Sequence, residues 1–506
     1  MRKYSLPFFL FIAFNSLSAQ DYDRYWVSGY SLSAEPPYQS NIVDFKNPAP
    51  TVDTTTIGIE IVGCAGAISD ADGNLQFYTN GGQIHNHAHA MMENGDGINP
   101  YPLLTNPLRG SPIRHTLSIL PSYTQSDIYY VIHQFVEVDT TLGLCINETL
   151  LTTVDMSANN GLGKVISKNV PIIQFPCSEY ASPVRHANGR DWWIVIPEYK
   201  YPIYHTLLFS EGVVVESFTQ NIGYKPDWEE DYDGGGINLF SPDGGTYVDH
   251  DPWNGTRIFD FDRCTGTLSN FRHITYPSQL PIGSAAVISP NSRYMYITAS
   301  SYMMQFDLEA PDLEASKDTV AVWDGFYSPQ PPLATTFGTG QLALNGKIYV
   351  APNNGVKHLH SIEYPDLPGD SCMVLQHSLE MPNYYALATP MNPNFRLYDE
   401  PGSVCDSLGI DGPPIVHVRP VPGDFELHVY PNPATEYLVI ESAFLPTQPD
   451  RLRLYSLDGK KVMERSHPSG VRSYSFDLPE MPSGVYILEV SCRGGQRYLK
   501  KVVVGR

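Results

Sequence analysis

The chain alternates short polar turns with aromatic-rich segments in which hydrophobic and polar positions follow a period of two. The clearest examples begin at Asp70 (DADGNLQFYTN), Tyr123, His186, Ser241, Ser289 and Leu344. Turn residues that tolerate positive φ, followed by residues that fill a partly buried strand, predict a β-hairpin at each place. No long segment has the i, i+3, i+4, i+7 spacing of an amphipathic helix. The pattern therefore predicts an all-β chain.

The hairpins return at intervals of roughly 45–65 residues, a period typical of propeller blades or similar arrays. A single four-stranded blade cannot bury both of its faces, whereas blades packed around an axis can. We expect a six- or seven-bladed β-propeller over residues 21–400. A strand near Trp26–Ser31 would pair with a strand near Asn394–Tyr398 to complete one blade. Two ordinary β-sandwiches are the alternative, but they would not explain the repetition.

The repeating pattern stops at Pro401. Residues 401–424 are rich in proline, which favours an extended path, so they predict a linker. Seven short strand patterns then follow within about 80 residues, the spacing of a small Ig-like β-sandwich. The charge changes at the same place, from a net -26 over residues 21–424 to +2 over residues 425–506. These changes predict a domain boundary near residue 425.

Residues 1–20 predict a secretory signal peptide. Arg2 and Lys3 precede an apolar core at Leu6–Phe14 that is too short to span a bilayer, and small residues up to Ala19 provide a cleavage site. A buried N-terminal strand is the alternative. No later segment has a long apolar run, so we expect no transmembrane segment in the mature chain.

Charge and cysteine content exclude several classes of function. The formal net charge is -22, so nucleic acid is not an expected partner, because a phosphate backbone requires a basic face. The seven cysteines are scattered and contain no CxxC pair, which excludes zinc-ribbon and thioredoxin-like sites. Export permits disulfides, although an odd number of cysteines leaves at least one thiol unpaired. The spacing does not assign the pairs.

The last 80 or so residues, a domain-sized span, contain a series of distinctive segments. They open on Tyr430-Pro431-Asn432-Pro433 and continue with LRLYSLDGKKV, LPEMPSGVYILEV and YLKKVVV. In this order the segments resemble the type A sorting domain of the type IX secretion system of Bacteroidetes. The resemblance implies the secretion machinery as a partner, and a secreted or outer-surface location. The residues that carry it are Tyr430, Pro431, Asn432, Pro433, Asp458, Gly459, Gly484, Tyr486, Lys500 and Lys501.

The larger region resembles the propeller-like repeats found in many such exported proteins. The likeness lies in CAGAISDADGNLQFYTNG from Cys64, HANGRDWWIVI from His186 and VCDSLGID from Val404. It implies a fold and not a function, because propellers carry many unrelated functions.

Two stretches of the form D-x-D-G are candidate cation sites. Asp70 and Asp72, and Asp231 and Asp233, alternate carboxylates in glycine-bearing loops, and hard oxygen ligands of this kind suit Ca²⁺. Both lack the later Glu of an EF-hand, so a plain hairpin or a solvated acidic loop is the alternative. No cofactor is firmly implied, and Ca²⁺ is the only candidate for these loops.

The alternating histidines of HNHAH are a candidate zinc site. In a strand, His85, His87 and His89 would lie on one face, where three imidazoles could bind Zn²⁺. A polar strand or loop is the alternative.

The cluster HANGRDWW is a candidate ligand surface, because aromatic faces pack against sugars and cations. Its candidate residues are Arg190, Trp192 and Trp193. The alternative is a turn followed by a core strand. No G-x-S-x-G elbow, phosphate loop or dinucleotide fingerprint occurs, and acidic residues are too common to single out a glycosidase pair. We therefore predict no catalytic residues.

We expect an exported, non-enzymatic propeller that binds glycan or protein. A secreted polysaccharide hydrolase or lyase on the same scaffold is the alternative. A pocket on the central face with two facing carboxylates, or with clustered Arg and Tyr, would favour the enzyme.

Overall fold

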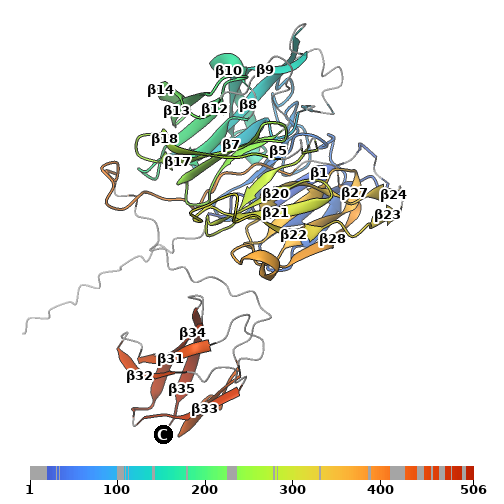
Figure 1. Cartoon of the computed structure of the whole chain (residues 1–506). Helices are drawn as coiled ribbons and strands as arrows, with labels where there is room; N and C mark the ends of the chain where they lie inside the picture. The colour runs from blue at the N-terminus through green and yellow to red at the C-terminus, as the bar shows by residue number, and fades with distance from the viewer. Residues whose placement is uncertain are drawn as a thin grey trace, which may run out of the picture. The chain divides into compact units, whose positions relative to one another are not determined.

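The computed structural model of the chain describes residues 20–29, 31–33, 35–99, 108, 110–111, 113–139, 143–177, 180–224, 236–276, 280–281, 283–329, 332–385, 389–408, 410, 428–441, 449–456, 460–466, 473–479, 481–492 and 497–505. The chain forms two compact units, Met1–Ile415 and Val416–Arg506, and both consist of β-strands (Figure 1). The helices with described bounds are two short 3₁₀ turns, Asn159–Gly161 and Gly369–Cys372. None of the described helices has the length and hydropathy needed to cross a bilayer.

The first unit is a succession of small antiparallel sheets in which neighbouring strands follow the order of the chain. Two sheets have three described strands: β1 (Tyr25–Gly29), β2 (Ser40–Asp44) and β3 (Thr51–Thr55), then β4 (Gly66–Ser69), β5 (Leu75–Thr79) and β6 (Ile84–Asn86). A four-stranded sheet follows, with β7 (Leu117–Pro121), β8 (Ile128–Asp139), β9 (Gly143–Asp155) and β10 (Lys164–Cys177).

The later sheets repeat the four-stranded form. They are β11 (Ser182–Arg185), β12 (Trp192–Pro197), β13 (Ile203–Ser210) and β14 (Val213–Asn221); then β15 (Ile237–Phe240), β16 (Thr246–Asp251), β17 (Gly255–Asp262) and β18 (Thr267–Ile274). Next come β19 (Ala286–Ile288), β20 (Tyr294–Thr298), β21 (Tyr302–Asp307) and β22 (Asp318–Val322), then β25 (Phe337–Leu342), β26 (Ile348–Pro352), β27 (Val356–Ile362) and β28 (Val374–Tyr385). A two-stranded hairpin, β23 (Tyr327–Pro329) and β24 (Pro332–Ala334), precedes the last sheet.

The six predicted hairpins are the first hairpins of six of these sheets, joining β4 to β5, β7 to β8, β11 to β12, β15 to β16, β19 to β20 and β25 to β26. In several of them one residue of the turn has a left-handed φ, such as Gly73 at 82°, Gly244 at 75° and Gly346 at 80°. In two of the turns a serine hydroxyl oxygen also accepts a hydrogen bond from the backbone N–H five residues later. Ser241 Oγ accepts from the Thr246 N–H at 2.9 Å, and Ser289 Oγ accepts from the Tyr294 N–H at 2.8 Å.

Each sheet packs face to face against the next. Clusters of buried side chains join neighbouring sheets, for example Val27 with Tyr78, Phe77 with Tyr129, Tyr130 with Phe209, Trp193 with Phe259, Ile258 with Ile297, and Tyr296 with Phe337. The last sheet returns to the first, because Tyr349 and Tyr385 share a cluster with Trp26 and Phe45. The row of sheets therefore closes on itself, which is the architecture of a β-propeller.

The strand pairing that we expected to complete a blade is wrong. β1 pairs with β2, and residues 394–398 form no strand. Pro390 and Pro393 precede this stretch, and proline offers no N–H to a ladder. Side chains, described below, hold the stretch in place instead. The packing of the β1–β3 sheet against the last sheet closes the ring.

The second unit has two sheets around one core. One sheet contains β29 (His428–Tyr430), β30 (Tyr437–Glu441) and β33 (Ser473–Asp477); the other contains β32 (Lys461–Ser466), β31 (Pro449–Ser456), β34 (Gly484–Cys492) and β35 (Arg497–Val504). Leu438 and Ile440 of the first sheet share a buried cluster with Leu454, Leu488 and Val502 of the second. Each of the seven predicted strand patterns contains one of these strands.

Candidate functional site

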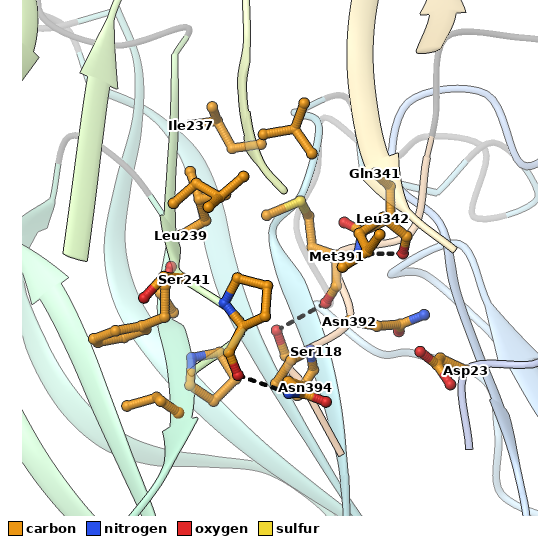
Figure 2. Close-up of a pocket in the computed structure, with 18 of the residues that line it drawn as sticks. Asp23, Ser118, Ile237, Leu239, Ser241, Gln341, Leu342, Met391, Asn392 and Asn394 are labelled. Carbon is orange, nitrogen blue, oxygen red and sulfur yellow. Dashed lines mark hydrogen bonds between the residues drawn. The ribbon is translucent and has the colours of Figure 1, made fainter. Parts of the chain in front are cut away.

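A cavity of about 290 Å³ lies where the first strands of several sheets converge. It is lined by residues of β7, β11, β15, β19 and β25. Figure 2 shows Ile237 and Leu239 of β15, Ser118 of β7 and Gln341 of β25 around it. Its walls are mainly apolar with a few polar groups, as is usual for small-molecule sites.

A stretch without helix or strand, residues 389–397, provides part of the lining of this cavity, and we call it the axial segment. Ser118 Oγ donates to the Met391 carbonyl at 3.5 Å, and Asn394 Nδ2 donates to the Pro242 carbonyl at 2.7 Å (Figure 2). At its beginning, Thr389 Oγ1 lies 3.4 Å from His115 Nε2. His115 precedes β7 and Pro242 follows β15, so the axial segment runs from the beginning of the inner strands to their far ends.

An ion pair holds the far end of the axial segment. Arg396 donates through both Nη atoms to the two oxygens of Asp23, at 2.7 and 2.8 Å, and through Nη1 to the Gln20 carbonyl at 3.1 Å. Burial alone would lower the pKa of Arg396, but its attraction and hydrogen bonds to Asp23 raise that pKa above its ordinary value. Phe395, fully buried beside Trp192, completes the anchor.

The chain that leaves the axial segment is fixed to the turns of two sheets. Arg263 donates to the carbonyls of Arg185 and Tyr398, and a disulfide joins Cys264 to Cys405. The first unit thus extends into the stretch that we expected to be a linker. The remainder of that stretch, residues 411–424, lies outside the described residues.

His115 and Tyr180 line the other end of the cavity, and Arg114 precedes His115 in the chain. His115 is 4% exposed, has a left-handed φ of 59°, and its ring meets the Tyr180 ring edge-on at 5.4 Å. Burial, helped by the charge of Arg114, lowers the pKa of His115 to about 3. Its imidazole is therefore neutral near pH 7. Arg114 donates from Nη1 to Asn353 Oδ1 at 3.2 Å, and burial lowers the pKa of its guanidinium.

The cavity does not bring two carboxylates together in the described part of the chain. Among the described residues of its lining Asp23 is the one acidic residue, and both of its oxygens accept from Arg396. In the described lining, the groups available to a ligand are apolar walls and neutral hydrogen-bonding side chains. This arrangement can bind and orient a ligand, but it offers no acid–base pair of carboxylates of the kind that glycosidases use.

The three residues of the predicted ligand surface do not form an exposed face. Trp192 and Trp193 are 3% and 2% exposed; Arg185 lies 3.8 Å over the Trp192 ring, and Trp193 Nε1 donates to the Arg263 carbonyl. Arg190 forms an ion pair with its neighbour Asp191. The burial of both indoles favours the alternative interpretation, a turn followed by a core strand.

The predicted cation-binding loop at Asp70 uses its carboxylate within its own turn. Asp70 Oδ1 accepts from the N–H groups of Asp72 and Asn74, and Oδ2 accepts from Asn74 Nδ2 and Gln76 Nε2. Asp231 and Asp233 lie outside the described residues.

The alternating histidines do not gather on one face. β6 ends at Asn86, and His85 is buried whereas His87 is exposed. His89 turns back toward the Tyr78 hydroxyl at 3.2 Å. In the described part of the chain no group of three His, Cys, Asp or Glu side chains could hold a metal ion.

The opening tetrapeptide of the predicted sorting signal is bonded to the last strand of the second unit. Asn432 Oδ1 accepts from the Val503 N–H at 2.8 Å, and Asn432 Nδ2 donates to the Lys501 carbonyl at 3.0 Å. Tyr430 ends β29, and Pro431 and Pro433 flank Asn432. The opening tetrapeptide is thereby tied to the last strand, β35.

The other sorting residues lie in or beside the four-stranded sheet. Gly484 opens β34 and pairs with Val504, and Lys500 and Lys501 lie on β35 opposite Leu488 and Ile487. Tyr486 is buried, and its hydroxyl donates to the Pro482 carbonyl at 2.8 Å. Asp458 and Gly459 lie outside the described residues.

Sequence reasoning did not identify the cluster at the beginning of the axial segment. Arg114 and His115 are separated only by Thr116 from LSILP, a strand whose five residues are all buried. Two adjacent basic residues before a mainly apolar, fully buried inner strand are a readable signal. Their partners Asn353 and Thr389 are more than 200 residues away in the sequence, so the pattern alone could not bring them together.

Comparisons with known proteins bear on the two units differently. Residues 428–505 match the family model of the secretion system C-terminal sorting domain. A search of curated proteins finds no match for the chain.

Among solved structures, the chain is similar to a functionally unknown protein from Desulfotomaculum acetoxidans, at 12% identity and a TM-score of 0.38, covering 73% of this chain and 100% of that one. It is also similar to the periplasmic gluconolactonase of Pseudomonas aeruginosa, at 12% identity and a TM-score of 0.34, covering 90% and 99%. The structure of the Dos1 propeller matches at 12% identity and a TM-score of 0.36, covering 71% and 84%. Likenesses this distant carry no argument about function, and the propeller assignment rests on the ring of sheets described above. Residues 428–505 are a secretion system C-terminal sorting domain, and the protein is accordingly a cargo of the type IX secretion system.

Proposed function

We propose that the protein is a non-enzymatic binding or adhesion module that acts at or beyond the outer cell surface, on a ligand presented by a glycan or a protein. Its first unit would be a seven-bladed propeller, one blade for each of the successive sheets from β1–β3 to β25–β28. The axial segment would take the place of an inner strand beside β1–β3. Its second unit would be an Ig-like sandwich that serves as the export signal.

The content of the axial cavity is the observation that carries this proposal. The protein's own axial segment forms part of the wall of this cavity, and Arg396 neutralises Asp23, the one acidic residue in the described lining. The remaining volume of about 290 Å³ is near the lower end of the range for small-molecule sites. A space of that size suits one sugar unit or one side chain rather than a long polymer.

Cleavage of a polysaccharide is a second candidate, favoured by the Arg114, His115 and Tyr180 cluster. His115 and Tyr180 line the pocket and Arg114 is the neighbour of His115 in the chain, which partly resembles the clustered Arg and Tyr that we expected of an enzyme. The low pKa of His115, about 3, opposes this function, because an efficient general base has a pKa near the working pH.

Binding and turnover can be measured on the same preparation of the mature protein. We expect saturable binding to at least one surface glycan or extracellular protein, detected as a rise in melting temperature, because a ligand that binds only the folded state stabilises it. We expect no product from the same glycans after prolonged incubation. Release of shortened oligosaccharides would overturn the binding assignment in favour of the second candidate.

A further inference from the structure

Three residues that line the axial cavity each carry a buried polar atom without a hydrogen-bond partner in the described part of the chain. The atoms are His115 Nδ1, Asn238 Oδ1 and Asn392 Nδ2. His115 is 4% exposed and Asn238 is 0% exposed, so bulk solvent does not satisfy them. Leaving a buried polar atom unpaired costs about 1–3 kcal/mol, and such atoms are few in folded proteins. Their meeting at one cavity points to a ligand that pairs with them.

The side-chain amide of Asn238 has a fixed orientation. Its Nδ2 donates to the Tyr180 carbonyl at 2.7 Å and to the Tyr247 hydroxyl at 2.8 Å, which uses both of its hydrogens. A reversed amide would set two oxygens against each other at Tyr180. Oδ1 is therefore a true acceptor, and only an O–H or N–H group can satisfy it. An ionised carboxylate or sulfate has no hydrogen to donate there.

His115 lies beside the same tyrosine. Its ring meets the Tyr180 ring edge-on at 5.4 Å, so His115 and Asn238 both contact Tyr180 at one end of the cavity. Burial lowers the pKa of His115 to about 3, and the imidazole is neutral near pH 7. Nε2 lies 3.4 Å from Thr389 Oγ1, and Nδ1 donates or accepts according to the tautomer. A hydroxyl group suits both tautomers, because it can donate as well as accept.

Asn392 supplies the third group, from the axial segment. Hydrogen bonds at Met391 and Asn394 fix this segment on both sides of it (Figure 2). Nδ2 of Asn392 has no partner among the described residues, whereas the same atom of Asn394 donates to the Pro242 carbonyl. Asn394 therefore holds the segment in place, and Asn392 keeps a donor for another molecule.

The described lining of the cavity has no net charge. Its charged side chains are Asp23 and Arg396, and each neutralises the other through two hydrogen bonds. An ionised ligand of either sign would lack a counter-charge there, and burying an unpaired charge is costly. Residues 21–424 also have a net charge of -26, which disfavours the approach of anions. The electrostatics therefore favour a neutral ligand.

We propose that the axial cavity binds one neutral sugar unit of a glycan, and that His115, Asn238 and Asn392 form hydrogen bonds with its hydroxyl groups. One hydroxyl donates to Asn238 Oδ1, another accepts from Asn392 Nδ2, and the apolar side chains of Ile237 and Leu239 contact the C–H groups of the sugar ring. This inference rests on the proposed binding function and narrows its ligand to a neutral glycan. A site of this kind rejects a ligand that lacks the hydroxyl, because the buried acceptor then stays unpaired.

The test measures binding of galactose, glucose and mannose to the mature full-length protein by calorimetry, with the uronic acid of each sugar as its anionic counterpart. We expect at least one neutral sugar to bind, and its uronic acid to bind about tenfold more weakly or not at all. Among the monodeoxy derivatives of the sugar that binds, at least one should also lose about tenfold in affinity, because it leaves Asn238 Oδ1 without a donor.

A pair of asparagine variants separates ligand binding from support of the fold. Asn392→Ala should weaken binding of the neutral sugar about threefold or more and should leave the melting temperature unchanged or raised, because it removes an unpaired donor. The matched control is Asn188→Ala, outside the lining of the cavity. Asn188 Oδ1 accepts from the N–H groups of Arg190 and Asp191, so this variant should have a lower melting temperature and an unchanged affinity.

The outcomes distinguish this inference from the function on which it rests. Undiminished sugar binding by Asn392→Ala, or a lower melting temperature with unchanged affinity, would overturn the hydroxyl site. Equal or tighter binding of the uronic acids would overturn it as well, as would failure of the neutral sugars while another glycan or a protein binds, and both results leave the binding function standing. Failure of every glycan and protein ligand would overturn both proposals.

Discussion

At the scale of single residues, the interior of the first unit holds neutral histidines in hydrogen-bond networks. His133 is fully buried in β8, with Nδ1 2.8 Å from Asn99 Oδ1 and Nε2 2.9 Å from Thr152 Oγ1. Burial lowers its pKa to about 3. His250, also buried, has its pKa lowered to about 4. These imidazoles join strands and carry no charge in the folded protein near pH 7.

We expect these histidines to make the first unit sensitive to acid. An unfolded histidine has a pKa of about 6.5, so below that pH the unfolded chain binds protons that the folded chain excludes. The stability from each group is complete above about pH 6.5 and is lost as pH falls toward the folded pKa, by about 1.4 kcal/mol per pH unit. Replacing His133 with Gln should therefore reduce the loss of unfolding free energy between pH 6 and pH 4 by about 2.5 kcal/mol.

Urea unfolding at pH 7, 6, 5 and 4 measures this loss. His87→Gln is the control, because His87 is exposed and its replacement should leave the pH dependence as in the wild type. An unchanged pH dependence in His133→Gln would show that His133 takes up a proton in the folded state.

The two tryptophans show what a sequence pattern can and cannot say about a single side chain. The alternation in HANGRDWWIVI correctly predicted a strand. It did not show that Trp192 and Trp193, which lie on opposite faces of β12, are both buried. In a propeller each sheet is covered by a neighbour on both faces, so a period of two no longer separates core from surface. Only the packing of whole sheets decides which aromatic rings a ligand can reach.

At the scale of elements, local chemistry explains why the hairpins were predictable and the axial segment was not. Turns such as Ser241–Thr246 close through hydrogen bonds within six residues. The position of the axial segment depends instead on the ion pair between Arg396 and Asp23 and on the hydrogen bond from Asn394 to the Pro242 carbonyl. Such distant partners have no signature in the local sequence, so we predicted that this stretch forms a β-strand paired with another strand.

The Arg396–Asp23 pair should contribute strongly to the stability of the first unit. Replacing Arg396 with Gln leaves Asp23, which is 5% exposed, without its counter-charge. We expect a loss of roughly 3 kcal/mol in unfolding free energy, because breaking a buried pair strands a charge. Arg293→Gln breaks a comparable two-pronged pair with Asp307 that lies nearer to solvent, and should cost less than about 1 kcal/mol. Equal losses in urea unfolding of the two variants would contradict this role for Arg396.

The Cys264–Cys405 disulfide should stabilise the same region by a different mechanism. It links residues separated by 141 positions, and closing so long a loop removes entropy from the unfolded chain. We expect the double variant Cys264→Ser/Cys405→Ser to lose about 2–5 kcal/mol. Reductant should lower the melting temperature of the wild type to that of the variant and leave the variant unchanged. Cys64, Cys177 and Cys372 are buried free thiols, so a reductant effect that persists in the variant would require another bond.

At the scale of the whole molecule, the two units have separate hydrophobic cores. The core of the second unit is confined to residues 434–504, whereas the clusters of the first unit involve residues no later than 397. The change in charge and the proline-rich stretch can be read from the sequence, because each is a property of a whole region. The closing of the ring could not be predicted in the same way, since it depends on contacts between Trp26 and Tyr349, which are far apart in the sequence.

Because the two units have separate cores, we expect that the sorting domain can be removed without unfolding the first unit. A chain lacking residues 428–506 should keep the melting temperature of the first unit, since no core residue of that unit is lost. The same chain should stay in the periplasm, because it lacks the sorting domain.

A smaller change is Asn432→Ala, which removes both hydrogen bonds that tie the opening tetrapeptide to β35. It should cost about 1–3 kcal/mol of stability within the second unit alone. We expect reduced surface delivery with an unchanged first unit, measured by cell fractionation beside calorimetry. Lys461→Ala, which removes an exposed ion pair with Glu464, should be delivered normally. Surface delivery of the truncated chain would mean that the first unit carries an export signal of its own, whereas truncation that melts the first unit would mean that the two units depend on each other for stability.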